Sequence, residues 1–249
     1  MTTYLVSRAP LRATRKQVQA LRGVLPGLAR VDVDLLELAL DLIPTCILAW
    51  STPEAARQIV AELAMLGLEV QALDEHALVR LELGCPSQPV LAQACFSPAF
   101  IPPSVVRATR SIDARIELRL WTAREPLDHD PIGARIQQGL ELDDFRPVEV
   151  LAAAGWLDAS ACASLLEALA ALHFQPDPAL EPRVGRDGMD VELRTLDERG
   201  EAHVELAWSP EPAEGPRLHA FLVTLLRACA GLELTPLLAR RLADLRRYL

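Results

Sequence analysis

The pattern of apolar and polar residues is clearest between positions 42 and 73, where it predicts a strand, a helix and a second strand in succession. Pro44 closes an apolar helix, and the short apolar run that follows it suits a buried strand. Ser51 and Glu54 have the spacing of a capping box, which marks the start of a helix. The apolar face of this helix recurs with the 3.6-residue period and ends at Gly67, after which the next strand begins. That face comprises Ala56, Ile59, Val60, Leu63 and Leu66.

Elements on both sides of this unit complete a compact α+β module over residues 1–84. A short β-prone segment opens the module, and two amphipathic helices follow it. After the central unit, apolar and polar positions alternate from Ala77 to Leu83, which predicts a further strand. The expected segments are a strand at 4–7, helices at 14–24 and 32–43, and strands at 68–73 and 77–83.

Prolines separate this module from the second half of the chain. They are too closely spaced over residues 85–112 for a continuous helix or strand, so we expect a connection there. The prolines concerned are Pro86, Pro89, Pro98, Pro102 and Pro103.

A second α+β domain is predicted over residues 113–249. Alternation from Ile116 to Trp121 indicates a half-buried strand, and a turn around Asp197 to Gly200 indicates a β-hairpin. Two final helices carry apolar stripes and are expected to form an antiparallel pair packed on that hairpin. The remaining segments are helices at 147–154 and 159–173 and hairpin strands at 189–196 and 202–208, and the last stripe is Leu238, Leu242, Leu245 and Leu249.

Composition narrows the classes of protein that fit. The hydrophobic content of 51% is ample for packed cores, and the net charge of −9 argues against nucleic-acid binding, which needs clustered cations. The 5 cysteines are odd in number and widely spaced, which fits reduced thiols better than a disulfide framework. We find no signal-peptide core and no apolar run long enough for a membrane span, so we expect a cytoplasmic protein without a membrane partner.

Several short segments between residues 3 and 73 occur in an order known from one family. They are Leu21-Arg22-Gly23, Pro26-Gly27-Leu28, Leu42-Ile43-Pro44, and the helix from Glu54-Ala55 that ends in Leu66-Gly67-Leu68-Glu69-Val70. With the order of elements, they resemble the C-terminal domain of the bacterial ribosomal stalk protein. In that family the domain recruits translational GTPases through a basic, partly apolar surface on its first two helices. The resemblance implies this fold and a role in protein binding, but not membership of the ribosome.

The resemblance also bears on single positions of the first two helices. Arg22 stands where the family has a basic residue, whereas Gln19 and Asp34 stand where it usually carries lysines. Arg15 and Arg22 are therefore the candidate partner-binding residues of this module.

The densest polar cluster is Asp128-His129-Asp130, which precedes a proline. Carboxylates that flank an imidazole could orient it or hold a divalent metal, although the same residues are common in exposed turns. The chain has no Gly-rich phosphate loop, CxxC, HExxH or GxSxG motif. We therefore assign no catalytic residue and no cofactor, and keep this cluster as a weak metal candidate.

Basic residues make the last helix unusual in an acidic chain. They could form a docking face for an acidic partner, or they could simply complement the dipole at the end of the helix. The residues are Arg240, Arg241, Arg246 and Arg247.

We therefore expect a non-enzymatic protein that acts through protein–protein contacts as an adaptor, assembly or regulatory factor. An immunity-type inhibitor is a variant of this hypothesis, because an acidic, compact protein suits a basic toxin. The competing class is a metal-assisted hydrolase that uses Asp128, His129 and Asp130. A homo-oligomeric structural subunit also stays open, with the leucine stripe of the last helix buried between copies.

Overall fold

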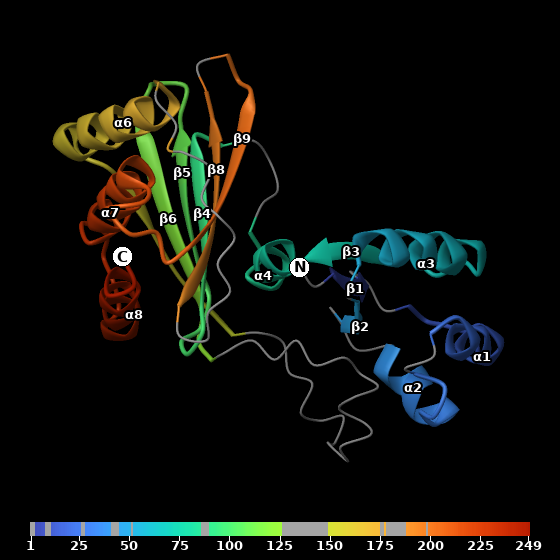
Figure 1. Ribbon diagram of the computed structural model, residues 1–249. Coiled ribbons are helices and arrows are strands. Elements are labelled where there is room, and N and C mark those ends of the chain that lie inside the picture. The colour runs from blue at the N-terminus through green and yellow to red at the C-terminus, as the bar shows by residue number, and fades with distance from the viewer. Residues whose placement is uncertain are drawn as a thin grey trace. The chain divides into compact units, whose positions relative to one another are not determined.

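The computed structural model of the chain describes residues 3–7, 11–25, 28–40, 45–50, 52–85, 90–125, 149–174, 177, 188–197 and 199–249. These residues form two compact units (Figure 1). Unit 1 contains the described residues up to Glu82, and unit 2 contains those from Leu83 onward. Each unit combines helices with an antiparallel sheet, so the protein has the predicted α+β class.

Unit 1 follows the predicted order of elements up to its third strand. Its sheet has β1 in the centre, with β2 and β3 antiparallel on either side. The elements in chain order are β1 (Thr3–Ser7), α1 (Arg15–Val24), α2 (Val33–Leu40), β2 (Thr45–Trp50), α3 (Pro53–Met65), β3 (Gln71–Asp74) and α4 (Glu75–Glu82).

Local signals account for two of these helices. Thr14 caps α1 in a reciprocal capping box with Gln17. The cap of α3 is Thr52, whose hydroxyl accepts the N–H of Ala55, and not the predicted Ser51. Gly67 follows α3 with a φ of 74°, a left-handed conformation that glycine adopts without a Cβ penalty.

The last element of unit 1 corrects the predicted strand at 77–83. This segment is the helix α4, which directly follows β3. Asp74 Oδ1 accepts the N–H of Ala77 at 2.7 Å and so satisfies a donor in the first turn of α4. The apolar positions of residues 77–83 fit the period of a strand and the period of a helix alike. The cap at Asp74 favours the helix.

Unit 2 is built on a six-stranded sheet with the order β7-β6-β5-β4-β8-β9, in which each neighbouring pair is antiparallel. The strands β4 and β5 lie within residues 85–112, so this stretch belongs to the sheet and is not the predicted connection. Pro98 stands at the end of β4, and Pro102 and Pro103 lie between β4 and β5. The strands are β4 (Ala92–Pro98), β5 (Ser104–Arg110), β6 (Ile116–Ala123), β7 (Val150–Trp156), β8 (Met189–Leu196) and β9 (Ala202–Trp208).

The edge strand β7 corrects a second prediction, the helix at 147–154. Its alanines favour a helix by intrinsic propensity. Seven successive residues of β7 nevertheless pair with β6, from Val150 opposite Ala123 to Trp156 opposite Glu117. Tertiary pairing therefore overrides local propensity in this segment.

The helices α6 (Ala159–Phe174), α7 (Pro216–Cys229) and α8 (Pro236–Arg246) pack on one face of the sheet (Figure 1). Phe96 of β4, Leu118 of β6 and Phe221 of α7 are buried in the core between the two layers. The final stripe also lies in this core, because Leu238, Leu242 and Leu245 are buried there. α7 contacts β6 and α8 contacts β7.

The leucine stripe of the last helix therefore packs within its own unit, which removes it as the surface between copies that the sequence left open. None of the helices that the structure describes is long and apolar enough to cross a bilayer.

Candidate interaction surface

A row of side chains crosses the face of the unit 2 sheet that points away from the helix-packed core. Arg119 of β6 lies opposite Arg107 of β5, and Arg107 lies opposite Gln93 of β4. Gln93 lies opposite Arg194 of β8, which lies opposite Val204 of β9. Successive residues of a strand point to opposite faces, and direct partners share a face. The pairing therefore gathers arginines from three strands on one face, where Gln93 and Arg107 are buried at 4% and 6% exposure and the flanking Arg119 and Arg194 are exposed.

The arginines of this row are held by residues of their own strands. Arg119 donates from Nη2 to Glu117 at 2.9 Å. Arg194 binds Glu192 through two nitrogens, with Nε at 2.7 Å and Nη2 at 3.3 Å from the carboxylate oxygens. The bidentate geometry fixes the guanidinium plane. The neighbouring carboxylates also offset the repulsion between Arg119 and Arg107, which stand directly opposite each other.

Apolar side chains are exposed at both margins of this face. Trp156 of β7 is 49% exposed, and Val204 and Leu206 of β9 are 55% and 52% exposed. The guanidinium carbon of Arg115 lies 4.5 Å from the centroid of the Trp156 ring, a cation–π contact. Exposed tryptophan and arginine are residue types that interfaces favour. We refer to this face, with its row and its margins, as the open face.

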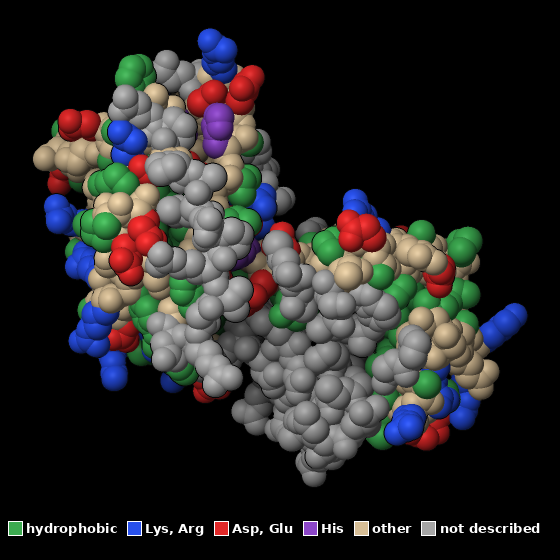
Figure 2. Space-filling view, viewed as in Figure 1, with side chains coloured by type: hydrophobic (Ala, Val, Ile, Leu, Met, Phe, Trp, Pro, Cys, Tyr) green, Lys and Arg blue, Asp and Glu red, His purple; other side chains and the backbone are tan. Residues whose placement is uncertain are grey.

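A separate polar cluster lies near the tip of the β8–β9 hairpin. Figure 2 shows a histidine beside acidic side chains there, at the top of the view. His203 Nε2 lies 3.3 Å from Asp197 Oδ2, and His173 at the end of α6 lies 2.8 Å from the Thr195 hydroxyl. The two imidazole rings are 5.3 Å apart. The cluster therefore ties the hairpin to α6.

The charges of this cluster follow from its surroundings. The backbone N–H of Glu201, with the His203 ring and the N–H of Arg199, lowers the pKa of Asp197. Burial, followed by the nearby His203, lowers the pKa of His173 and favours its neutral form.

The hydroxyl that contacts this cluster is poorly accessible. Thr195, the hydroxyl next to His173, is only 4% exposed. The Cys229 thiol is fully buried, and burial raises its pKa to about 12. These groups are poorly placed for nucleophilic catalysis, which needs an activated and reachable atom. We therefore regard the cluster as structural.

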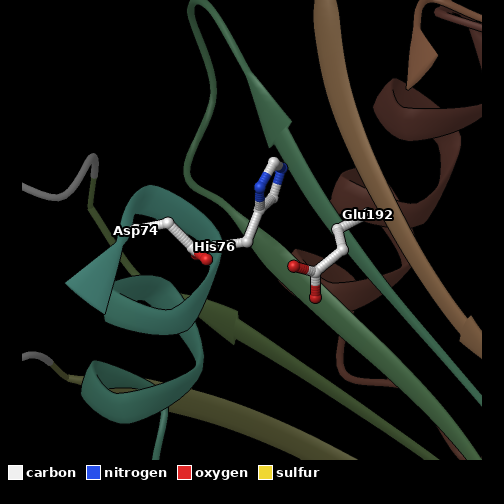
Figure 3. A group of neighbouring side chains, drawn as sticks. All are labelled: Asp74, His76 and Glu192. Atoms are coloured by element: carbon white, nitrogen blue, oxygen red, sulfur yellow. The ribbon is translucent and has the colours of Figure 1, made fainter. Parts of the chain in front are cut away.

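Three further side chains are drawn in Figure 3. Asp74 and His76 come from the junction of β3 and α4 in unit 1, and Glu192 comes from β8 in unit 2. Two of these residues make hydrogen bonds within their own unit. Asp74 caps α4, and Glu192 binds the guanidinium of Arg194.

The residues predicted from sequence have mixed outcomes. Asp128, His129 and Asp130 lie outside the described residues. Arg15 forms an exposed ion pair with Asp34 of α2 at 3.1 Å. Arg22 donates to the Ala29 carbonyl after α1 and so supports a turn.

Basic side chains do gather over α8, at the lower left of Figure 2. Several of them make contacts within the unit. Arg241 donates to the Arg124 carbonyl at 3.3 Å, Arg246 to the Leu226 carbonyl at 2.8 Å, and Arg247 pairs with Asp244 at 3.2 Å. Arg240 is exposed on the surface.

The open face was not among the sequence predictions. Its arginines come from strands that are far apart along the chain, so no local motif contains them. The available signal was the alternation within each strand, but only the register shows that Arg107, Arg119 and Arg194 share one row.

The fold and this face define an α+β protein of two units with a mixed polar and apolar sheet surface. Comparison of the chain with protein-family models, with curated proteins and with solved structures found no match.

Proposed function

We propose that this protein is a non-enzymatic protein-binding factor, an adaptor, assembly or regulatory protein, and that the open face of unit 2 binds its partner. The single observation that carries the proposal is the composition of this face. The ion-paired Arg119 and Arg194 are exposed on either side of the buried Arg107 and Gln93, and Trp156, Val204 and Leu206 are half exposed at its margins.

The physical argument rests on what such a face contributes to binding. Burial of exposed apolar side chains supplies free energy of association, at about 25 cal/mol for each Å² removed from water. Arginines that are already fixed by Glu117 and Glu192 lose little rotamer entropy when a partner binds. Their remaining donors then give orientation and specificity.

The resemblance of unit 1 to the ribosomal stalk C-terminal domain supports the same class of function. The order from β1 to β3, with α1 and α2 between the first two strands, is the order on which that resemblance rests. Under this proposal unit 1 is a second binding module.

The experiment is affinity capture of the tagged protein from its own cells, with mass spectrometry and a metal assay on the same sample. We expect one stoichiometric protein that is lost in a Val204→Glu, Leu206→Glu double variant. The control is Phe174→Glu, which places one such charge on an apolar side chain that is 86% exposed elsewhere in unit 2.

The outcomes separate the hypotheses. A partner that the double variant loses and Phe174→Glu retains supports the proposal, and a small basic toxin as that partner makes the protein an inhibitor. Equal retention by both variants refutes the open face as the site. A bound metal with no partner would instead favour a hydrolase around His129.

A further inference from the structure

Two histidines meet where the end of α6 packs on the β8–β9 hairpin. Thr195 of β8 lies directly opposite His203 of β9, on the face of the sheet that packs against the helices. His173 in the last turn of α6 reaches this pair from the helix layer, and its Nε2 lies 2.8 Å from the Thr195 hydroxyl. The centroids of the two imidazole rings are 5.3 Å apart. These three side chains therefore form a joint between the end of α6 and the hairpin.

The carboxylates near this joint interact more strongly with one ring than with the other. Asp197 Oδ2 lies 3.3 Å from His203 Nε2, and the charge of His203 also acts on Glu205, two residues farther along β9. His173 has the Thr195 hydroxyl as its only hydrogen-bond partner among the described residues. The effect of Asp197 on His173 is smaller than the effects of burial and of His203. A positive charge is therefore better compensated on His203 than on His173.

The other elements packed at this joint add little charge to it. Asp177 is held at the start of α7, where it accepts the N–H of Arg217 and pairs with the Arg217 guanidinium. On β4, the residue opposite Thr195 is the uncharged Ala92. The charge of the joint therefore depends mainly on the two imidazoles and on the two carboxylates beside His203.

Protonation has opposite consequences for the two rings. On His203 a proton strengthens the contact with Asp197, because an imidazolium donates a charge-assisted hydrogen bond to a carboxylate. On His173 a proton adds a partly buried charge close to the first one. The end of a helix favours a cation, but burial and then His203 lower the pKa of His173. The folded joint therefore accommodates a first positive charge better than a second.

We propose that His173 and His203 form a proton-operated latch, which holds the end of α6 on the hairpin while at most one ring is charged and releases it when acid charges both. Release separates the last turn of α6 from Thr195, so that the helix layer and the hairpin are joined less firmly. The inference is independent of the partner proposed for the open face, which is the opposite face of the same sheet.

The direction of the pH dependence follows from the lowered pKa of His173. A base with a lower pKa in the folded state contributes stability that is complete above its unfolded pKa of about 6.5 and decreases as the pH falls toward the folded pKa. Protonation of Glu205, whose pKa is raised by burial, removes a negative charge near His203 in the same acid range. We therefore expect the latch to hold at neutral pH and to release at about pH 5.

Hydrogen exchange of the full chain, followed by mass spectrometry, gives the first test. Relative to the intrinsic rate at each pH, we expect exchange in the last turn of α6 to be at least about tenfold faster at about pH 5 than at about pH 7.5. The helix α8 serves as the internal reference and should keep its protection. Unchanged protection of α6, or loss of protection in both helices together, overturns the proposal.

Neutral replacements of each ring test which groups carry the effect. His173→Gln and His203→Gln each leave one imidazole, so the last turn of α6 should stay protected at about pH 5. The matched control is His219→Gln, which replaces a histidine of the same unit that binds the Leu249 carbonyl, and it should release α6 as the unmodified chain does. Release in all three variants shows that the two rings do not form the latch.

Nuclear magnetic resonance of the imidazole protons provides a measurement that does not depend on the stability of these variants. In the His203→Gln variant the titration midpoint of His173 should move to higher pH, because the neighbouring charge is gone. A midpoint that does not move would refute the coupling between the rings.

Discussion

The two edge strands of the unit 2 sheet, β7 and β9, occupy equivalent positions but carry different chemistry. β7 is uncharged and rich in alanine. β9 contains His203 and Glu205, and its hairpin turn carries Asp197. An edge with charged groups resists pairing with another strand, whereas an uncharged edge permits it. The comparison teaches that the two margins of one sheet can differ sharply in charge.

The helix layer beneath β7 should be the most sensitive part of this arrangement. Leu242 of α8 is buried in the core of unit 2, and α8 contacts β7. Leu242→Asp places an unpaired charge there, so we expect a loss of about 4 kcal/mol or more in the free energy of unfolding. Urea denaturation followed by circular dichroism measures it.

The control on the same helix is Arg240→Ala. This residue is exposed, so its replacement should change the free energy of unfolding by less than about 0.5 kcal/mol. A folded Leu242→Asp variant of unchanged stability would mean that α8 does not support the sheet.

Each edge strand also has a contact with a glycine, and the two contacts differ in tightness. A Cβ on Gly188 would lie 2.3 Å from atoms of the Trp208 ring of β9, whereas one on Gly155 of β7 would lie 3.0 Å from Leu232 Cδ2. A rigid indole cannot yield as a leucine methyl can. We expect Gly188→Ala to cost about 2–3 kcal/mol and Gly155→Ala less than about 1 kcal/mol.

Thermal unfolding of these two variants under identical conditions makes the comparison. Equal losses in the free energy of unfolding for Gly188→Ala and Gly155→Ala would show that the contacts with Trp208 and Leu232 do not set the cost of an added methyl group.

The carboxylate of Glu205 should make the β9 edge dependent on pH. Burial, and then the nearby Asp177, raise the pKa of Glu205. A raised pKa gives a stabilising contribution that is complete below the unfolded pKa of about 4.3 and is lost as the pH rises through the folded pKa. Glu205→Gln should therefore stabilise unit 2 at pH 7, by no more than about 1 kcal/mol because solvent screens this group.

Urea titrations between pH 4 and pH 8 measure this difference. We expect the advantage of Glu205→Gln to shrink as the pH falls. An advantage that stays constant over this range would show that titration of Glu205 is not its cause.

The smallest effect should come from the cation–π contact at the end of β7. Arg115→Ala removes the guanidinium above Trp156, and we expect a loss of about 0.5 kcal/mol because the site is exposed. A double-mutant cycle with Trp156→Ala isolates the pairwise free energy. A coupling of zero would mean that the guanidinium of Arg115 and the ring of Trp156 lie near each other without stabilising the fold.

Elements with strong local signals were the ones that the sequence predicted well. The helices α1 and α3 have N-caps and, for α3, a terminal glycine, and the β8–β9 hairpin has its turn at Gly200. The apolar stripes of α7 and α8 also lie in the core as predicted, through residues such as Leu222 and Leu238.

The errors occurred where distant parts of the chain decide the conformation. The sequence predicts a connection where β4 and β5 lie, because prolines are nearby, and it predicts a helix where β7 lies. Even the start of α7 depends on a distant residue, because Asp177 accepts the N–H groups of Arg217 and Leu218 at 3.0 Å and 2.9 Å. No local window of sequence contains these partners.

The candidate sites follow the same division. The sequence identified basic residues such as Arg22 and Arg246, but not that both would be engaged by carbonyl groups of their own unit. It contained the alternation of each strand, but not which strands are neighbours. The row of the open face therefore could not be predicted.

The sequence by itself determined the α+β class, the helices α1 and α3 and the apolar faces, because these depend mainly on residues within a few positions of one another. Tertiary structure alone decided that an alanine-rich segment becomes the edge strand β7 and that Arg107, Arg119 and Arg194 share one face. The physical reason is that strand pairing is set by hydrogen bonds and packing between segments far apart in the chain, and these outweigh the small intrinsic preference of each residue.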